Sequence, residues 1–195
     1  MEKKDINIPN ILSASRLFCL PLLFFLLYKD WKTAFLVAYM IVGSTDFFDG
    51  QIARRFNLKT ELGKKLDSFA DLFFYVSTAW FVAVLFPEYL QPNKILLIVF
   101  FSLFFLSFVI STIFCRKPIM MHTFLLKLNG VLVYFLVLVS FRWDTTLFIS
   151  LILLIYLVGF TEEIVIFIRY GDVDPDTLSI FHLMKKPEEK KIEGK

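Results

Sequence analysis

The stretch Ile95–Cys115, ILLIVFFSLFFLSFVISTIFC, is the part of the chain that decides the fold. It contains no charged residue, and it has the length of about 20 residues that a helix needs to cross a bilayer. Such a run predicts a membrane-spanning helix, because a segment in lipid must satisfy its own backbone hydrogen bonds. A β-barrel would instead show strands of about 10 residues with alternating polarity.

Apolar stretches of similar character lie on both sides of this segment. The second stretch of the chain is short for a span unless the residues after Thr45 continue its helix. The five further stretches are Ile11–Tyr28, Thr33–Thr45, Phe69–Phe86, Phe124–Phe141 and Leu147–Ile168. We therefore predict an all-α, polytopic integral membrane protein with six transmembrane helices.

The two ends of the chain have a mixed character. Asn7–Ser15 combines polar and apolar residues, which predicts an N-terminal juxtamembrane amphipathic segment. Residues 1–170 would form the membrane domain, and residues 171–195 a cytosolic C-terminal tail. Within this tail, Asp174-Pro175 is typical of a helix start, and Leu178, Phe181 and Met184 would then share one face. A frayed tail is the alternative.

The composition agrees with a membrane location. Hydrophobic residues make up 57% of the 195 positions, whereas soluble domains contain about 45–50%. The charged fraction is 20%, so the charges must be segregated from the apolar runs. These values exclude a disordered chain and a typical soluble globule, and the net charge of +3 is too small to indicate a nucleic-acid partner.

Basic residues predict the orientation. Fifteen Lys and Arg residues fall on the side that holds both termini and the 50–65 loop, and four fall on the opposite side. Cytoplasmic loops carry the excess of basic residues. Both termini are therefore predicted to lie in the cytosol, which requires an even number of spans.

Two pairs of aspartates lie where the second and third stretches reach this cytosolic side. Asp46 and Asp49 are three residues apart, and Asp67 and Asp71 are four apart. On a helix, each pair shares one face. Because the loop between the two helices is short, the two faces can meet, and four carboxylates would then gather at membrane depth.

Four carboxylates near hydrocarbon need compensation, because each ionised group is costly there and like charges repel. Shared protons would supply it, but divalent metal ions do so better, and oxygen ligands without His or Cys suit Mg²⁺, Mn²⁺ or Ca²⁺. Gly50 and Gly63 would let a ligand approach the backbone, although either could cap a helix. Arg54 is a planar cation placed to bind phosphate.

These residues resemble the signature of the CDP-alcohol phosphatidyltransferase family. All eight signature positions are matched at the family spacing within 26 residues. The matched run is Asp46-x-x-Asp49-Gly50-x-x-Ala53-Arg54-x8-Gly63-x3-Asp67-x3-Asp71. The six predicted spans and the opening Asn7-Ile8-Pro9-Asn10 are also similar to the membrane domain of this family.

The resemblance implies a transferase that displaces CMP from a CDP-linked donor with the hydroxyl group of an alcohol. The four aspartates would surround two Mg²⁺ or Mn²⁺ ions, with Asp67 in the catalytic centre and Asp71 as the general base. The CDP moiety would be bound by Asp49, Gly50, Ala53, Arg54 and Gly63. Family resemblance further implies a homodimer in a prokaryotic plasma membrane, with an active site open to the cytosol.

The small size of the chain resembles family members that use CDP-diacylglycerol as the lipid donor. Glycerol 3-phosphate is the first expectation for the acceptor, with serine, inositol, inositol phosphate or another polar alcohol as alternatives. A phosphorylated acceptor needs further cations, for which Arg116 and Lys127 are candidates, together with Lys117 and His122 in the same region. Glycerophosphate enzymes typically carry an Ala-Arg-Glu-Phe-like run late in the fourth span. This chain has Val109–Cys115 at that place, and this run contains no arginine; Arg116 follows directly after it.

Two features leave other functions open. Intramembrane acidic residues also occur in divalent-cation transporters, although such proteins more often show broken helices in both halves of the chain. Glu162 and Glu163 lie within the sixth apolar run. One of them could contact an amine-bearing acceptor or orient a cation, or both could mark the interfacial end of a shorter helix.

Overall fold

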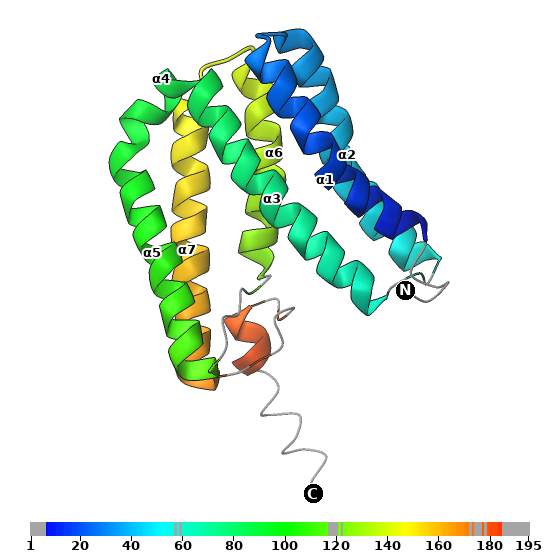
Figure 1. Ribbon diagram of the computed structural model, residues 1–195. Coiled ribbons are helices and arrows are strands. Elements are labelled where there is room, and N and C mark those ends of the chain that lie inside the picture. Colours follow the sequence, from blue (N-terminus) through cyan, green and yellow to red (C-terminus); the bar gives the residue numbers. More distant parts are fainter. Residues whose placement is uncertain are drawn as a thin grey trace, which may run out of the picture. The chain divides into compact units, whose positions relative to one another are not determined.

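The computed structural model describes residues 7–56, 58, 60–116, 121, 123–171, 173, 177 and 179–184, without the side chains at 47, 54, 61 and 64. All regular secondary structure in these ranges is helical (Figure 1). The chain divides into two compact units, Met1–Pro87 and Glu88–Lys195. The all-α prediction is therefore confirmed, and each unit has its own packing.

The first unit consists of α1 (Ile8–Tyr28), α2 (Lys32–Arg55) and α3 (Glu61–Leu85), and α1 packs against both of the others. Asn7 caps α1, because its side chain accepts a hydrogen bond from the backbone N–H of Asn10. The helix is continuous from Ile8. Residues 8–15, expected as a juxtamembrane amphipathic segment, form the first turns of α1.

Aromatic packing sets the register of α2 against α3. The rings of Phe35 and Phe81 meet edge to face at 5.1 Å between centroids, and Tyr39 shares a hydrogen bond of 3.2 Å with Thr78. Phe35, Tyr39, Thr78 and Phe81 are fully or almost fully buried. Continued along the same antiparallel pair, this register places the aspartates of α2 opposite those of α3.

The second unit contains α5 (Lys94–Cys115), α6 (Phe124–Ser140) and α7 (Thr146–Tyr170), and α7 packs against both of the others. Before them lie two short elements that the sequence did not predict, α4 (Pro87–Leu90) and the 3-10 helix η2 (Gln91–Asn93). Asn93 ties the start of α5 to α7, since it donates to the Thr146 carbonyl at 2.9 Å and accepts from Ser150 at 2.6 Å.

Four helical segments within the described ranges are long and apolar enough to cross a membrane: Ile8–Tyr28, Lys65–Leu85, Pro87–Cys115 and Thr146–Tyr170. Phe124–Ser140 is apolar but shorter. Large apolar side chains are exposed along these helices; Phe18 and Leu147, for example, are each 83% exposed. Long apolar helices with an apolar exterior characterise a polytopic integral membrane protein.

The tail after α7 is described in part. Residues 180–184 are helical, and Val173, Ile180 and Leu183 pack against a buried cluster of Cys115, Met121, Ile166 and Phe167. Phe181 and Met184, expected on one apolar face, are exposed. Asp174, Pro175 and Leu178, which belong to the same prediction, lie outside the described residues.

Candidate active site

The predicted carboxylates come together in the first unit. Asp46 and Asp49 lie on the second half of α2, and Asp67 and Asp71 lie on the first half of α3. Carboxylate oxygens of Asp46, Asp49 and Asp67 lie within 4.8 Å of one another. The side chain of Asp49 is only 4% exposed, whereas those of Asp46 and Asp67 are 41% and 42% exposed. Asp49 is therefore buried in the unit, whereas Asp46 and Asp67 remain accessible to solvent or to a ligand.

This donor set fits a divalent metal ion. Each of the three aspartates can turn one oxygen toward a common point, and hard oxygen donors without His or Cys suit Mg²⁺ and Mn²⁺. These ions also keep several waters or take up phosphate oxygens, and the partial exposure of Asp46 and Asp67 leaves room for such ligands.

Arg16 of α1 lies among all four carboxylates, a placement that sequence reasoning missed. Its Nη2 atom is 2.8 Å from Asp49, 3.3 Å from Asp46 and 3.8 Å from Asp67, and its Nη1 donates to Asp71. The Arg16 side chain is only 1% exposed. A single arginine within an otherwise apolar run was the signal in the sequence, because a charge there needs a partner.

Two other polar residues extend the same face of α1. The Ser13 hydroxyl lies 3.0 Å from Asp49 Oδ2 and 3.4 Å from Asp67 Oδ1, as a donor to these carboxylates. Asn10 Nδ2 donates to Thr60 Oγ1 at 3.2 Å, next to the N-terminus of α3. Since Asn10, Ser13 and Arg16 follow one another at intervals of three, they form one polar stripe on α1.

Gly63 allows α1 to approach α3 closely. A Cβ atom at this position would lie 2.4 Å from Asn10 Oδ1 and 3.0 Å from Thr60 Oγ1. Thr60 caps α3 by accepting a hydrogen bond of 2.9 Å from the Gly63 N–H. The space beside this glycine, which we had expected to serve the substrate, therefore holds the side chains of Asn10 and Thr60.

The remaining predicted CDP-binding residues lie on α2. Gly50 and Ala53 are half-buried and share the helix face that carries Asp46 and Asp49. Arg54 belongs to the same helix, but its side chain is outside the described part of the structure.

The two acceptor-site candidates belong to the second unit. Arg116 is exposed and caps α5 in the left-handed conformation, with φ of 56°, and Lys127 is exposed on α6. Lys117 and His122 lie outside the described residues. Asn129 on α6 is fully buried, and neither of its side-chain amide atoms has a hydrogen-bond partner among the described residues.

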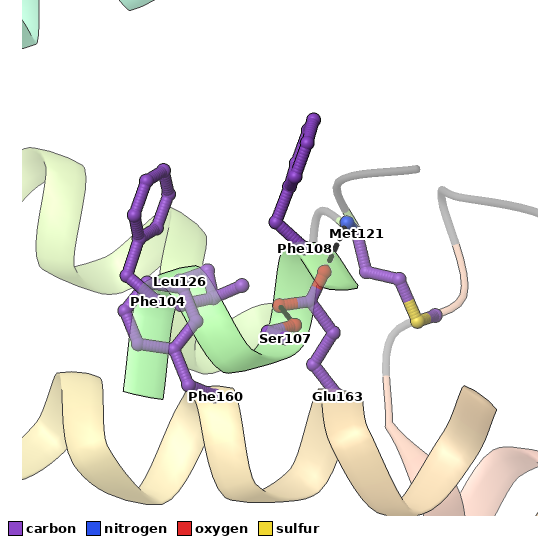
Figure 2. A pocket seen from close by; sticks show the side chains of 7 residues that line it. All are labelled: Phe104, Ser107, Phe108, Met121, Leu126, Phe160 and Glu163. Carbon is purple, nitrogen blue, oxygen red and sulfur yellow. Dashed lines mark hydrogen bonds between the residues drawn. The ribbon is translucent and has the colours of Figure 1, made fainter. Parts of the chain in front are cut away.

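Glu163 forms a second buried polar centre, as Figure 2 shows. Its carboxylate accepts hydrogen bonds from Ser107 Oγ at 2.8 Å and from the Met121 backbone N–H at 2.7 Å. A small pocket beside it is lined by these residues together with Phe104, Phe108, Leu126 and Phe160. Glu163 thereby joins α7 to α5 and to the connection that precedes α6.

Glu162 holds the tail. Its Oε1 atom accepts a hydrogen bond of 2.9 Å from the backbone N–H of Ile180, at the start of the helical residues 180–184. The two neighbouring glutamates of α7 thus bind different segments: Glu163 binds α5 and Met121, and Glu162 binds the tail. These hydrogen bonds join parts of the chain to α7.

Comparison with known proteins agrees with this site. The family model described as CDP-alcohol phosphatidyltransferase matches residues 6–170 of the chain. That range contains all eight signature residues and most of the 195-residue chain. The chain therefore belongs to the CDP-alcohol phosphatidyltransferase family, a family of transferase enzymes, and the resemblance drawn from the aspartate signature is confirmed.

Individual relatives are similar over shorter regions. The CDP-diacylglycerol–glycerol-3-phosphate 3-phosphatidyltransferase of Rickettsia bellii is 39% identical over 72 residues, 35% of this chain and 40% of that protein. The protein of that name from Aquifex aeolicus is 40% identical over 68 residues, 35% and 38% of the two chains. A cardiolipin synthase (CMP-forming) from Streptomyces coelicolor is 35% identical over 82 residues, 37% of each chain.

The chain thus spans about two-fifths of the length of the curated relatives it matches. No solved structure is significantly similar to it.

Proposed function

We propose that this protein displaces CMP from CDP-diacylglycerol with the hydroxyl group of a polar alcohol, which forms a phosphodiester. The observation that carries the proposal is the group of signature carboxylates from α2 and α3, whose oxygens lie within 4.8 Å of one another for three of the four aspartates. The family match and the names of the relatives support the same chemistry.

Asp46, Asp49 and Asp67 would hold divalent ions in this proposal, and Asp71 would complete the set of four carboxylates. When bound, Mg²⁺ or Mn²⁺ would neutralise the charge that develops on the leaving CMP. Arg54, Gly50 and Ala53 would accommodate the CDP moiety, with Arg54 directed at the diphosphate, whereas the close packing at Gly63 assigns that glycine to the contact between α1 and α3.

Asp71 is the proposed general base for the acceptor hydroxyl. A carboxylate that is strongly ligated to a metal is a weak base, so the base should be the least ligated of the four. Asp71 does not belong to the compact group formed by Asp46, Asp49 and Asp67, and its side chain is 32% exposed. A base within hydrogen-bond reach of an alcohol typically accelerates the reaction by about 10²–10⁴-fold.

Glycerol 3-phosphate is the proposed acceptor, as in the names of the Rickettsia and Aquifex relatives. Arg116 and Lys127 are proposed to bind its phosphate, because both are cations exposed at the ends of apolar helices. The unpartnered amide of Asn129 supports a polar ligand near the start of α6, since buried amides normally have hydrogen-bond partners.

The proposed topology follows from the basic residues and from the helices. It has six spans formed by α1, α2, α3, α5, α6 and α7, with both termini and the carboxylates on the cytosolic side. The acyl chains of the donor would then stay in the bilayer while its headgroup reaches the aspartates. A homodimer is proposed from family resemblance alone.

Release of CMP from CDP-diacylglycerol tests the proposal. The purified protein in lipid nanodiscs is incubated with Mg²⁺ or Mn²⁺ and one acceptor at a time: glycerol 3-phosphate, serine, inositol or inositol phosphate. We expect CMP and a new lipid with glycerol 3-phosphate, no reaction in Asp67→Asn, and full activity in Asp30→Asn, which changes an exposed aspartate outside the site. A folded protein that releases no CMP with any acceptor would refute the enzymatic function.

Two further experiments test the alternatives. Formation of cardiolipin with phosphatidylglycerol as the acceptor, without any reaction of glycerol 3-phosphate, would align the protein with its Streptomyces relative and would refute glycerol 3-phosphate as the acceptor. Uptake of Mn²⁺ into proteoliposomes, without any CMP release, would favour a divalent-cation transporter.

A further inference from the structure

We propose that Arg16 is an internal counter-ion of the carboxylate site, which a divalent metal ion displaces from its carboxylates on binding. Arg16 would then be a positioning residue that holds the four aspartates together until metal and donor arrive. This inference rests on the proposed function for its role in the reaction, but its physical content concerns only charge, metal affinity and stability.

The position of one nitrogen atom carries the argument. Arg16 Nη2 lies 2.8 Å from Asp49 Oδ2, 3.3 Å from Asp46 Oδ1 and 3.8 Å from Asp67 Oδ1. These three residues are the ones whose oxygens converge on a common point. The guanidinium group and a metal ion would therefore draw on the same three carboxylates, and we infer that the two cations compete for them.

The charge of the site explains why a guanidinium lies there. Four aspartates would carry four negative charges when ionised, and among the side chains that the structure describes, Arg16, 1% exposed, lies within salt-bridge distance of all four. A buried charge without a partner is strongly unfavourable. Because Arg16 has a forked, permanently charged group, it can contact carboxylates from α2 and α3 simultaneously.

Other residues of α1 hold the helix in place without the charge of Arg16. Ser13, one turn earlier, donates to Asp49 of α2, and Asn10 donates to Thr60 at the start of α3. Removal of the Arg16 guanidinium therefore leaves contacts of α1 with both neighbouring helices. A variant at this position can accordingly report on the charge of the site rather than on the attachment of the helix.

The test compares Arg16→Gln with the wild-type protein in detergent, by thermal unfolding in EDTA and in Mg²⁺ and by Mn²⁺ binding measured with electron paramagnetic resonance. In EDTA, we expect Arg16→Gln to unfold about 6 °C lower or more, because breaking a buried ion pair strongly destabilises a protein. Mg²⁺ should restore most of this loss, and Mn²⁺ should bind at least about fivefold more tightly, as for two ligands that compete.

Two further variants complete the design. Arg142→Gln, which removes an exposed arginine outside the site, should leave both measurements unchanged. Arg16→Gln combined with Asp49→Asn removes one charge of each sign, and it should unfold in EDTA closer to wild type than Arg16→Gln alone. This comparison keeps the test decisive if the single variant folds poorly.

Several results would overturn the proposal: wild-type stability of Arg16→Gln in EDTA, weaker Mn²⁺ binding, or a loss of stability that Mg²⁺ does not restore. The last result would make Arg16 a simple tether between helices. Failure of wild type to release CMP would refute the proposed function but would leave these binding and stability results interpretable.

Discussion

Gly63→Ala is the substitution for which the structure makes the most detailed prediction. The added methyl group would lie 2.4 Å from Asn10 Oδ1 and 3.0 Å from Thr60 Oγ1, so at least Asn10 must move. Asn10 is only 6% exposed, and its amide donates to Thr60. The same movement would therefore disturb the cap of α3 and the contact between α1 and α3.

The magnitude follows from three contributions. Overpacking in a closely packed region costs about 1–3 kcal/mol, and loss of the Asn10–Thr60 hydrogen bond costs about 1 kcal/mol more. Replacement of glycine by alanine within a helix stabilises the folded state by about 1 kcal/mol, because alanine has the higher helix propensity. The net destabilisation of Gly63→Ala is therefore about 1–3 kcal/mol, which lowers the melting temperature of a chain of this size by about 2–12 °C.

A double-mutant cycle with Asn10→Ala tests this reasoning, by differential scanning fluorimetry in detergent and by CMP release. Because Asn10→Ala removes the atom that the new methyl group meets, the double variant should be less destabilised than the two single effects predict when added. The packing explanation would be refuted by two results together. Gly63→Ala would have wild-type stability, and its KM for the donor would be raised and would not be restored by Asn10→Ala. That result would show that Gly63 makes room for the substrate instead.

Three further predictions concern the site and the second unit. Asp71→Asn should abolish CMP release while Mn²⁺ and donor binding, measured by calorimetry, stay largely intact; loss of donor binding would contradict the separation of roles. EDTA should abolish CMP release in wild type and an excess of Mg²⁺ or Mn²⁺ should restore it, whereas activity that persists in EDTA would rule out a metal-dependent reaction. Glu163→Ala should lower the melting temperature more than Ser107→Ala. It leaves two buried donors, Ser107 Oγ and the Met121 N–H, without an acceptor, and each such donor costs about 1–3 kcal/mol. Equal effects of the two variants would show that the Met121 hydrogen bond contributes nothing.

Continuous apolar runs predicted the long helices well, because a membrane span must be both helical and apolar. The runs starting at Ile95 and Phe124 correspond to α5 and α6 within one residue at either end. The start of α3 was less accurate: the apolar run begins at Phe69, but the helix begins at Glu61, after the Thr60 cap. Hydropathy detects the part of a helix that contacts lipid, whereas capping and polar contacts decide where the helix begins.

The segment between the apolar runs that end at Phe86 and begin at Ile95 contains Pro87 and Pro92. It nevertheless forms two short helical elements, α4 and η2. Proline is tolerated in the first turn of a helix, where no N–H partner is needed. Pro87 occupies the first position of α4, and Pro92 lies within the first two positions of η2.

The candidate site was predicted in part. Spacing alone placed Asp46 with Asp49 and Asp67 with Asp71, because each pair lies within one helical turn. The contribution of α1 could not be derived from local spacing, since its contacts span 33 residues from Arg16 to Asp49 and 55 from Arg16 to Asp71. The spacing of Asn10, Ser13 and Arg16 indicates a polar face of α1, but it does not indicate which residues of the other helices meet that face.

The apolar packing of the first unit and the chemistry of its site are connected through a single register. Tyr39 lies opposite Thr78, and Asp46 follows Tyr39 by about two helical turns, while Asp71 precedes Thr78 by the same interval along the antiparallel helix. The aromatic contacts of Phe35 and Tyr39 therefore determine which carboxylates of α2 and α3 meet. The polar stripe of α1 then supplies what this pairing lacks, namely a cation and a hydroxyl group directed at the carboxylates. Because the site needs both the register and the stripe, the signature on α2 and α3 accounts for the ligands of the proposed metal ions but not for how four like charges are held together.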